Sequence, residues 1–433
     1  MSNTDNQIHA IVHYEDDYVQ PLILAALKAR LPPEILVLLN SDSEIPSPNA
    51  KVLQWRQYEA LNLDDASAHP ATNLINAYII RKALIRKHYL STTVAHWLTK
   101  NPGSIVKSHV KPSVEFEVDY AEFLDDALVE AFELRESFEK NADLPESERE
   151  WWILKPGMSD RGQGIRLFST EEELTEIFEQ WEEELPDSDD EAEHSDDERS
   201  AAAGTSGAIM TSQLRHFVAQ PYVHPPLLLP EPFSSAGRKF HIRTYVVAVG
   251  ALKVYVYKPM LALFAAEPYT APGTSESGDV NEELTAHLTN TCLQSGEREG
   301  SVHAFWSLPS EVCGLPARDW KEDVFTQICK VTGEVFEAAA RSMSIHFQPL
   351  PNAFEIFGVD YLVDAEGQAW LLEINAFPDF KQTGDDLSGI IQGLFEDVVT
   401  VGVAPFFHLE GSDAASEGTE SMVKALDIDL GRR

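Results

Sequence analysis

Two carboxylates and one amide near the end of the chain have the spacing of a metal site. Two apolar runs flank Glu366-Gly367, a dipeptide that suits a two-residue hairpin turn. Pairing residues outward from this turn places Asp360 opposite Glu373, and Asn375 shares the face of Glu373 because side chains alternate along a strand. The same register gives two further pairs nearer the turn, Asp364 with Ala369 and Leu362 with Leu371.

Carboxylates that face each other across a sheet destabilise it unless something compensates their charge. A hard cation would do so, and oxygen ligands of this kind suit Mg²⁺, which takes its other ligands from water and phosphates. We therefore predict that Asp360, Glu373 and Asn375 bind magnesium. The alternative is that the carboxylates are protonated, or paired with lysine, on an exposed face of the sheet.

A lysine followed by a glycine-rich turn suggests a phosphate contact. Lys155 ends the apolar run of residues 151–154. Three glycines follow that would let a backbone approach a phosphate closely: Gly157, Gly162 and Gly164. The stretch is not a Walker A loop, because no Gly-Lys-Ser/Thr follows. Taken alone, it fits a glycine-rich hairpin without a ligand equally well.

A third stretch places cations on one face of a strand. Alternation along residues 237–243 puts Lys239, His241 and Arg243 on one side and apolar residues on the other. Two cations on a polar face suggest contact with an anion; the alternative is a solvated strand face. Lys258 lies near the end of the next strand, and residues 287–290 form a polar tetrad that alone indicates only a turn or a helix cap.

Hydrophobic periodicity predicts the elements that position these residues. Strands are expected at residues 7–12, 35–39, 216–219 and 244–257, and helices at residues 19–30, 73–90 and 119–140. The helix of residues 73–90 is basic, and we assign Arg86 and Lys87 to its solvated face. Since a new strand begins at Trp151, a domain boundary is expected near Glu150.

Two segments have too few apolar residues to bury a core. Residues 182–207 are acidic and then rich in Ala, Gly and Ser, so we expect a disordered insert. Residues 410–433 are expected to be a poorly ordered tail, apart from a short helix near residues 422–426.

The overall composition limits the classes of function. The chain has 433 residues and a net charge of −38, which argues against sequence-independent binding to nucleic acid because phosphates would be repelled. Residues 171–198 hold sixteen Asp or Glu and no Lys or Arg, and the remainder is still acidic. The three cysteines suit neither a disulfide scaffold nor a zinc site. With no secretory signal and no apolar run of membrane-spanning length expected, a reducing interior is the simplest setting.

Taken together, these segments resemble the tubulin tyrosine ligase family. The ordered motifs that carry the resemblance are Ile153-Leu154-Lys155-Pro156, Ala219-Gln220-Pro221-Tyr222-Val223, Arg238-Lys239-Phe240-His241-Ile242-Arg243, His287-Leu288-Thr289-Asn290, and Leu372-Glu373-Ile374-Asn375. A weaker match continues into the N-terminal region at Arg81-Lys82-Ala83. The resemblance implies an α+β protein with an ATP-grasp fold and a smaller N-terminal α/β domain. The expected units are residues 1–150, a catalytic domain over residues 151–405 that contains the insert, and a flexible tail over residues 406–433.

The resemblance also implies roles for individual residues. Lys82 and Lys155 resemble phosphate contacts, and Gln220 with the backbone near Tyr222 and Val223 resembles the adenine hinge. The residues that resemble ribose and substrate-channel contacts are Lys239, His241, His287, Leu288, Thr289 and Asn290. The residues that resemble magnesium ligands are Asp360, Glu373 and Asn375, in agreement with the hairpin argument.

Family members transfer the terminal phosphoryl group of ATP to a carboxylate, and an amine then attacks the acyl phosphate. This chemistry needs positioning and charge neutralisation more than a protein nucleophile. Arg243 and Lys258 are our candidates to hold the acceptor carboxylate and the migrating phosphoryl group. The sequence departs from the family pattern at three positions: Pro221 replaces the hinge lysine, where the backbone can still serve, His241 replaces an aspartate, and Lys258 replaces an arginine. The last two departures bear on which amino acid and acceptor are used.

The leading hypothesis is a cytoplasmic, monomeric ligase that adds tyrosine to a C-terminal glutamate of α-tubulin, with ATP and Mg²⁺ as cofactors. Within the same class, a glycylase, a glutamylase or another peptide ligase is the alternative. A nucleotide-binding scaffold in cytoplasmic RNA granules (P-bodies) is a hypothesis from another class. The acidic tubulin tail would need a basic groove, for which Lys82, Arg238, Arg243 and Lys258 are candidates.

Overall fold

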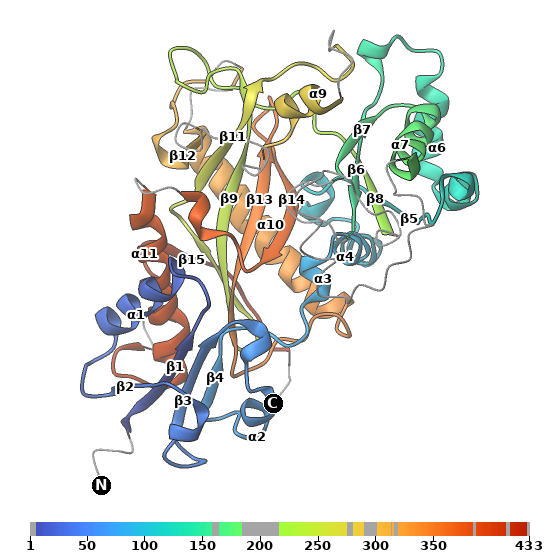
Figure 1. Cartoon of the computed structure of the whole chain (residues 1–433). Helices are drawn as coiled ribbons and strands as arrows, with labels where there is room; N and C mark the ends of the chain where they lie inside the picture. The colour runs from blue at the N-terminus through green and yellow to red at the C-terminus, as the bar shows by residue number, and fades with distance from the viewer. Residues whose placement is uncertain are drawn as a thin grey trace.

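The computed structural model describes residues 6–157, 164–183, 216–274, 280–289, 301–312, 314–315, 319–383, 387–412 and 416–430. Three β-sheets with flanking helices form the molecule, which confirms the expected mixed helix and sheet class (Figure 1). The predicted acidic insert, residues 182–207, lies outside the described residues except for its first two, which end α7 (Glu171–Glu183).

The N-terminal sheet is parallel, with strand order β2-β1-β3-β4. Its strands are β1 (Ile8–His13), β2 (Leu36–Leu39), β3 (Lys51–Arg56) and β4 (Asn73–Ile75). Between β1 and β2 runs α1 (Val19–Arg30), with the bounds predicted for this helix. This α/β unit agrees with the strand, helix and strand expected over residues 7–39.

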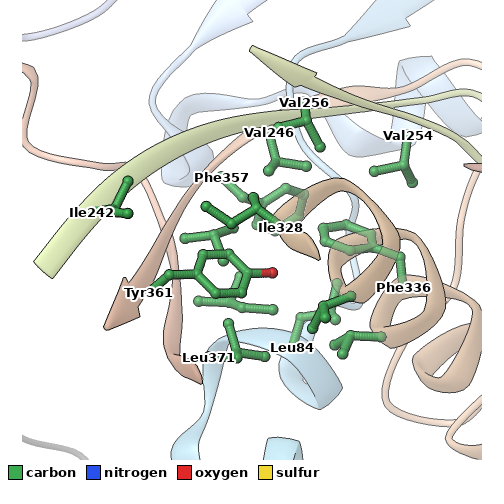
Figure 2. Packing of buried hydrophobic residues seen from close by; sticks show 14 of the residues in the cluster. Leu84, Ile242, Val246, Val254, Val256, Ile328, Phe336, Phe357, Tyr361 and Leu371 are labelled. Atoms are coloured by element: carbon green, nitrogen blue, oxygen red, sulfur yellow. The ribbon is translucent and has the colours of Figure 1, made fainter. Parts of the chain in front are cut away.

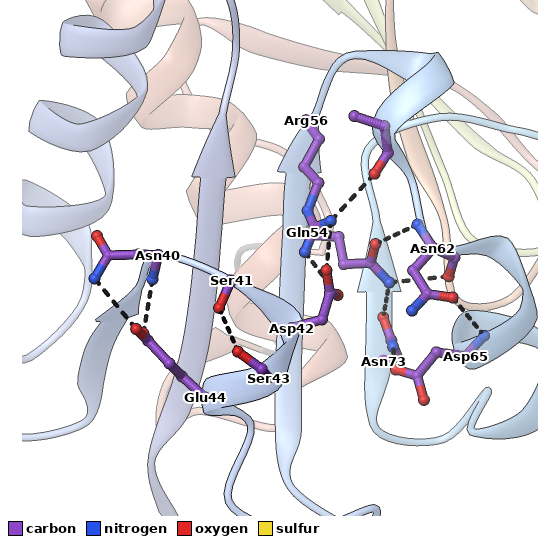
Figure 3. A network of polar contacts seen from close by, with 11 residues as sticks. Asn40, Ser41, Asp42, Ser43, Glu44, Gln54, Arg56, Asn62, Asp65 and Asn73 are labelled. Atoms are coloured by element: carbon purple, nitrogen blue, oxygen red, sulfur yellow. Dashed lines mark hydrogen bonds and ion pairs between the residues drawn. The ribbon is translucent and has the colours of Figure 1, made fainter.

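A buried amide ties this sheet to the short helix α2 (Leu63–Ala68). The Gln54 side chain, fully buried, donates to Asn73 Oδ1 at 3.1 Å and accepts from the Asn62 backbone at 2.8 Å (Figure 3). Arg56 beside it donates to both oxygens of Asp42 at 2.8 and 2.9 Å. Because a buried polar group must be hydrogen-bonded, these contacts fix the connections between the strands.

The central sheet has seven strands and is built around β9 (Arg238–Val249). One edge of β9 pairs from His241 to Val249 with β13 (Phe354–Val363), while the other edge pairs first with β11 (Leu261–Pro268) and then with β10 (Lys253–Tyr257). The remaining strands are β12 (Val302–Ala304), β14 (Ala369–Ala376) and β15 (Met422–Asp427). The single strand predicted at residues 244–257 is therefore wrong, because Gly250, with φ of 61°, turns the chain between β9 and β10.

The long helix α10 (Trp320–Ser342) covers one face of this sheet. Phe336 packs on Phe357 of β13 with ring centroids 5.3 Å apart, and the Tyr361 hydroxyl bonds to Thr332 of the helix at 2.8 Å (Figure 2). Figure 2 also shows Leu84 of α3 and Leu371 of β14 in the same core. Since this face is dry and fully packed, the opposite face of β9 and β13 is the one that can hold a ligand.

The third sheet is antiparallel and smaller, with order β5-β8-β6-β7. Its strands are β5 (Val114–Glu117), β6 (Trp152–Pro156), β7 (Arg166–Phe168) and β8 (His216–Pro221). The helices α6 (Phe132–Asn141) and α7 pack on it through an aromatic core that includes Phe178, Trp181 and Phe217. β5 precedes Glu150 yet pairs with β8 beyond it, so the division at Glu150 stays a proposal.

Two predicted helices are broken in the structure. Residues 73–90 contain β4 and two helices, α3 (Lys82–Ile85) and the start of α4 (Lys87–Lys100). Residues 119–140 form short helical turns, α5 (Leu124–Ala127) and α6, interrupted at Ala131, whose ψ of 59° is not helical. Tertiary packing on the sheets outweighs helical periodicity at both places.

The C-terminal prediction is also wrong. The expected short helix near residues 422–426 is the edge strand β15, which pairs with β10. Its apolar residue Met422 is fully buried, and Ala425 packs against α10 at Gly333, where an added Cβ would lie 2.6 Å from the Ala425 carbonyl. Met-Val-Lys-Ala-Leu does not alternate, so pairing with β10, and not periodicity, makes this segment a strand.

The segment Ser388–Phe406 is long and apolar enough to cross a membrane by length and composition alone, which contradicts the expectation that no such run exists. It comprises α11 (Ser388–Val398), a π-helical turn and α12 (Ala404–Phe406). Ile391, Leu394 and Phe395 are buried in a core shared with α1 and the N-terminal sheet. A helix that packs in a protein core, as this one does, can have the same length and apolar composition as a membrane-spanning helix.

Candidate functional site

A cavity of about 380 Å³ lies between the small sheet and the central sheet. β6 and β8 contribute residues from one side, and β9, β11, β13 and β14 contribute residues from the other. Thirteen of the predicted site residues line it: Lys155, Gln220, Tyr222, Val223, Lys239, His241, Arg243, His287, Leu288, Thr289, Asp360, Glu373 and Asn375. Segments more than two hundred residues apart in the sequence therefore meet in one site.

The predicted metal ligands lie side by side on β13 and β14. Asp360 is the cross-strand partner of Glu373, and Asn375 follows on the same strand, as predicted. The Arg243 guanidinium donates to both oxygens of Asp360, at 2.5 and 3.0 Å. Asn375 donates to Glu373 at 2.9 Å, and Lys87 Nζ lies 3.6 Å from the other Glu373 oxygen.

The register of this hairpin differs from the prediction near its turn. Asp364 N bonds to Gln368 O, so the loop has three residues and Gly367 adopts φ of 83°. The predicted pairs Asp364–Ala369 and Leu362–Leu371 are therefore wrong. A β-bulge on β14 then shifts the register back by one residue, which restores the pairing of Asp360 with Glu373.

Two carboxylates and an amide fit a magnesium ion that completes its shell with water and phosphate oxygens. Within the described ranges no three His, Cys, Asp or Glu side chains form a metal-binding group, and the predicted set has two acids only. Each carboxylate oxygen has two lone pairs, so the hydrogen bonds from Arg243 and Asn375 leave acceptor positions open. These residues could therefore hold a divalent cation, but only with ligands from a bound phosphate.

The electrostatics around Glu373 favour its ionised form. Burial by itself would raise the pKa of Glu373, but Lys87, the Asn375 amide and Lys155 outweigh it and lower that pKa to about 2. Burial disfavours the charged form of Arg243 too and by itself would lower its pKa. The Asp360 carboxylate outweighs this effect and raises the pKa of Arg243 above its ordinary value. Glu373 is thus held as an anion by the surrounding cations.

Lys155 points from β6 towards Gln220 of β8. Its ammonium donates to Gln220 Oε1 at 2.8 Å, and Gln220 in turn donates to Ser113 at 2.6 Å. Burial lowers the pKa of Lys155 to about 8, although Glu373 acts in the opposite direction. A buried cation that is easily neutralised gains much from an anionic ligand, as a phosphate contact requires.

Lys239, Tyr222 and His287 form a second polar group in the cavity. Lys239 Nζ donates to the Tyr222 hydroxyl at 2.7 Å, and this hydroxyl lies 2.9 Å from His287 Nδ1. Burial and the neighbouring Lys155 lower the pKa of Lys239 to about 7. Burial, with Lys239 and His224, lowers the pKa of His287 to about 3, so its imidazole is neutral and can accept a hydrogen bond.

His241 is one of the three residues that depart from the pattern of the resembled family. It is buried beside the predicted metal ligands. Its Nδ1 lies 2.5 Å from the Thr289 hydroxyl, and its Nε2 lies 3.7 Å from Asp360 Oδ1. Burial lowers the pKa of His241, against the opposing effect of Asp360. A neutral imidazole therefore stands where the pattern has a third carboxylate, which leaves Asp360 and Glu373 as the acids for a cation.

Two predicted site residues among those that the structure describes, Lys258 and Lys82, do not line the cavity. The Lys258 ammonium bonds to Glu322 of α10 at 2.9 Å and lies over the Trp306 ring at 4.9 Å. Lys82 is exposed at the start of α3 and does not line the cavity. Asn290 lies outside the described residues, as do residues 158–163 of the glycine-rich turn.

Two lysines that the sequence argument missed do line the cavity. Lys87 was assigned to a solvated face, but the break between α3 and α4 turns it towards Glu373. Lys111 stands with its ammonium 4.0 Å from the Trp370 ring centre, and burial lowers its pKa. No pattern in the sequence marks either lysine, because both positions depend on where irregular segments meet the sheets.

Comparisons with known proteins agree with this geometry. The model of the tubulin-tyrosine ligase family matches residues 74–410. A probable tubulin–tyrosine ligase of Schizosaccharomyces pombe is 45% identical over 94% of this chain and 94% of its own length. The probable tubulin–tyrosine ligase PBY1 of Saccharomyces cerevisiae is 43% identical over 99% of this chain, which spans 56% of that protein.

A solved structure gives the fold. The crystal structure of the C-terminal domain of K. lactis Pby1, described as an ATP-grasp enzyme interacting with the mRNA decapping enzyme Dcp2, is similar with a TM-score of 0.69 and 38% identity. The similarity covers 97% of this chain and 99% of that domain. The expected ATP-grasp fold is therefore confirmed.

Proposed function

Because this chain belongs to the tubulin-tyrosine ligase family, we propose that it is an ATP- and Mg²⁺-dependent ligase that joins a carboxylate to an amine. One observation carries the proposal. Asp360, Glu373 and Asn375 line the same cavity as Lys155, Lys239 and Arg243, so acids for a metal ion and cations for phosphates face each other. This combination suits a magnesium–nucleotide ligand.

Each part of the cavity has a role in this proposal. Lys155 and Lys239 would neutralise phosphate oxygens, and Gln220 with the backbone of Tyr222 and Val223 would hold the base. Asp360, Glu373 and Asn375 would hold Mg²⁺. When bound, ATP would supply the phosphoryl group that activates the acceptor carboxylate as an acyl phosphate.

Arg243 and Lys87 would organise the reacting groups. Arg243 is held by both Asp360 oxygens, so its guanidinium has a fixed orientation beside the metal ligands. Lys87, 3.6 Å from Glu373, would make the phosphate contact that we expected of Lys82 and would hold the migrating phosphoryl group in place of Lys258. A fixed cation costs no reorganisation when negative charge develops, which is how such a site lowers a barrier.

We propose tyrosine as the amino acid and the C-terminal glutamate of α-tubulin as the acceptor, with another glutamylase or peptide ligase activity as the alternative. Five cations supply the local basic groove that an acidic tail needs on a protein of net charge −38: Lys87, Lys111, Lys155, Lys239 and Arg243. The proposal also takes the protein to be a cytoplasmic monomer without direct contact to nucleic acid.

A second candidate is a nucleotide-binding scaffold of cytoplasmic RNA granules. Its support is the similarity to a domain described as interacting with a decapping enzyme. In this case the cavity would bind nucleotide and a partner surface would carry the function. The acids at Asp360 and Glu373 favour the ligase, since opposed carboxylates destabilise a sheet that has no use for a cation.

Calorimetric titration with ATP, with and without Mg²⁺, is the first test. The wild-type protein should bind ATP in a magnesium-dependent manner, and the Asp360→Ala/Glu373→Ala variant should not. Glu366→Ala is the matched control, because Glu366 is exposed at the turn of the same hairpin. Ligation assays with tyrosine, glutamate and glycine on detyrosinated tubulin then separate the activities. Absence of ATP binding by folded wild-type protein would overturn the ligase proposal.

A further inference from the structure

The segment of residues 119–133 exposes an unusual number of apolar side chains. Among the described residues, eight large hydrophobic side chains are exposed, and four of them lie here: Tyr120, Phe123, Val129 and Phe132. Phe132 is 70% exposed although it begins α6. Isolated exposed apolar residues need no explanation, but several within thirteen residues mark an interaction surface.

The other side of the same segment is anchored in the core of the small sheet. Leu124, Leu128 and Ala131 are buried there with Phe116 and Phe178. The exposed apolar residues therefore face outward from a fixed support, and the rings of Tyr120 and Phe123 meet edge to face with centroids 6.1 Å apart. Figure 1 places the segment at the outer edge of the molecule, beside α7.

This surface is strongly acidic. Its exposed acids are Asp119, Glu122, Asp125, Asp126, Glu130 and Glu133, and no Lys or Arg occurs between Lys111 and Arg135. The neighbouring helix α7, whose Glu182 accepts a hydrogen bond from the Ala121 backbone, also has no Lys or Arg. The exposed apolar side chains are thus surrounded by acidic residues, and this part of the sequence contains no Lys or Arg to offset the negative charge.

The charge selects among occupants. Nucleic acid and anionic lipid surfaces would be repelled, and a second copy of this chain would bring six acids against six. We infer that residues 119–133 form a docking surface for a basic amphipathic segment of a partner protein, with apolar residues to cover the exposed rings and Lys or Arg to pair with the acids. Such an arrangement corresponds to an amphipathic segment laid on an apolar surface with complementary charge at its rim.

This inference does not depend on ligase activity. None of the four exposed apolar residues lines the 380 Å³ cavity, so the apolar part of the surface is separate from the proposed nucleotide site. Of the surface acids, Glu133 lines a neighbouring pocket that shares Lys87, Lys155 and Gln220 with that cavity, and it is therefore left unchanged in the variants below. A partner could bind whether or not ATP is present, and a variant that loses partner binding should keep ATP binding.

The test measures binding of two designed peptides to the full chain by fluorescence anisotropy. One is an 18-residue amphipathic peptide of Leu and Lys, and the other has the same composition in scrambled order. We expect the full chain to bind the amphipathic peptide at least tenfold more tightly. Since a protein of net charge −38 attracts any basic peptide, this difference between the peptides is the informative quantity.

Variants locate the binding site. Phe123→Ser/Phe132→Ser should abolish the preference for the amphipathic peptide, whereas the control Ile345→Ser, at a side chain that is 76% exposed elsewhere, should keep it. Glu122→Gln/Asp126→Asn/Glu130→Gln should weaken binding and flatten its salt dependence more than Glu34→Gln/Glu59→Gln/Asp64→Asn. All of these side chains are exposed, so thermal unfolding should be unchanged.

Equal binding of the two peptides by the wild-type protein would overturn the inference. Equal loss of preference in the Ile345→Ser control, or unchanged preference in Phe123→Ser/Phe132→Ser, would also overturn it. Dimerisation of the wild-type protein that is lost in Phe123→Ser/Phe132→Ser would assign the surface to a second copy, against the proposal.

Discussion

Glu355 on β13 and Glu373 on β14 belong to adjacent strands of one sheet, and their environments shift their pKa values in opposite directions. Glu355 is 1% exposed, accepts from the Tyr78 backbone at 3.0 Å and lies 2.8 Å from Arg81 Nε. Burial raises the pKa of Glu355 to about 8, and Arg81 offsets only part of the effect. Burial acts on Glu373 in the same sense, but several cations outweigh it and lower its pKa to about 2.

The difference lies in the number of cations and in access to solvent. Glu355 has one close cation and lies against a space of about 20 Å³, too small for a ligand. Glu373 faces Lys87, Lys155 and Arg243 across a cavity of about 380 Å³. A surplus of positive charge around an accessible carboxylate indicates a site for an anionic ligand, whereas a single closed ion pair indicates a structural connection.

Arg81 makes that structural connection between the N-terminal region and the edge of the site. Its guanidinium lies 4.0 Å from the Tyr58 ring and 5.2 Å from the Phe377 ring, and it donates to the Tyr78 carbonyl. Phe377, with φ of 54°, follows Asn375 by two residues. A left-handed phenylalanine is strained, and the stacking by Arg81 stabilises it.

The largest effect is expected from Glu373→Ala. The rate of ligation should fall at least about a thousandfold, because the proposed metal site loses a ligand and the surrounding cations lose their counter-charge. The fold should remain intact, since the Glu373 side chain is 30% exposed. Initial rates of amino-acid incorporation and thermal unfolding measure the two quantities. Glu366→Ala should retain full activity, and ligation by Glu373→Ala would remove the metal assignment.

Glu355→Gln should instead lower the stability of the fold and leave ATP binding nearly unchanged. Glu355→Gln replaces the buried carboxyl that contacts Arg81 and accepts from the Tyr78 backbone with an amide whose NH₂ group faces the guanidinium, so the free energy of unfolding should fall by about 2 kcal/mol. ATP affinity should change less than about threefold, because Glu355 does not line the large cavity. Denaturant unfolding and calorimetry test both statements on the same sample. A large loss of affinity in protein that unfolds like the wild type would contradict the contrast between the two glutamates.

The juxtaposition of the two carboxylates that we propose as metal ligands was predictable from the sequence, because alternation along a strand is a local property. The pairing of Asp360 with Glu373 was reached although the predicted turn was one residue too short, since the β-bulge on β14 compensates the error. The α1 helix and the first two strands were also predictable from periodicity. Each of these features depends on neighbours in sequence or on one hairpin.

The missed parts depend on distant packing. Lys87 reaches Glu373 only because α3 ends at Ile85 and α4 restarts beyond it, and the helical pattern of residues 73–90 does not reveal that break. Lys258 was placed in the site by its position after a strand, but Glu322 of α10 and the Trp306 ring hold it elsewhere. β15 was read as tail because its pairing partner lies about 170 residues earlier.

A smaller effect is expected from pH. The lowered pKa values of Lys155, about 8, and Lys239, about 7, mean that both ammonium groups are largely charged at pH 6.5 and largely neutral at pH 9 in the free protein. Phosphates bind the charged forms, so binding should take up protons and ATP affinity should fall roughly tenfold between pH 7 and pH 9. Calorimetry in buffers of different ionisation enthalpy measures this uptake.

The lysine variants provide the control for this pH dependence. Lys239→Met should bind ATP more weakly at pH 6.5 and take up fewer protons, whereas Glu355→Gln should show the wild-type profile. An affinity that does not change between pH 6.5 and pH 9 would show that neither lysine contacts the nucleotide phosphates.

The smallest effect is expected from Arg81→Lys, which keeps the charge beside Glu355 but removes the planar group that stacks on Tyr58. Loss of the stacked geometry should lower the free energy of unfolding by about 1 kcal/mol. If the stacking also holds the strained Phe377, the magnesium affinity of the ATP complex should weaken slightly, about twofold, because Asn375 lies two residues away. Arg341→Lys, which changes an exposed arginine paired only with Glu337, is the matched control. Unchanged stability in Arg81→Lys would mean that charge alone makes this connection, and Glu355 and Glu373 would then differ only in how many cations surround them and in their exposure to solvent.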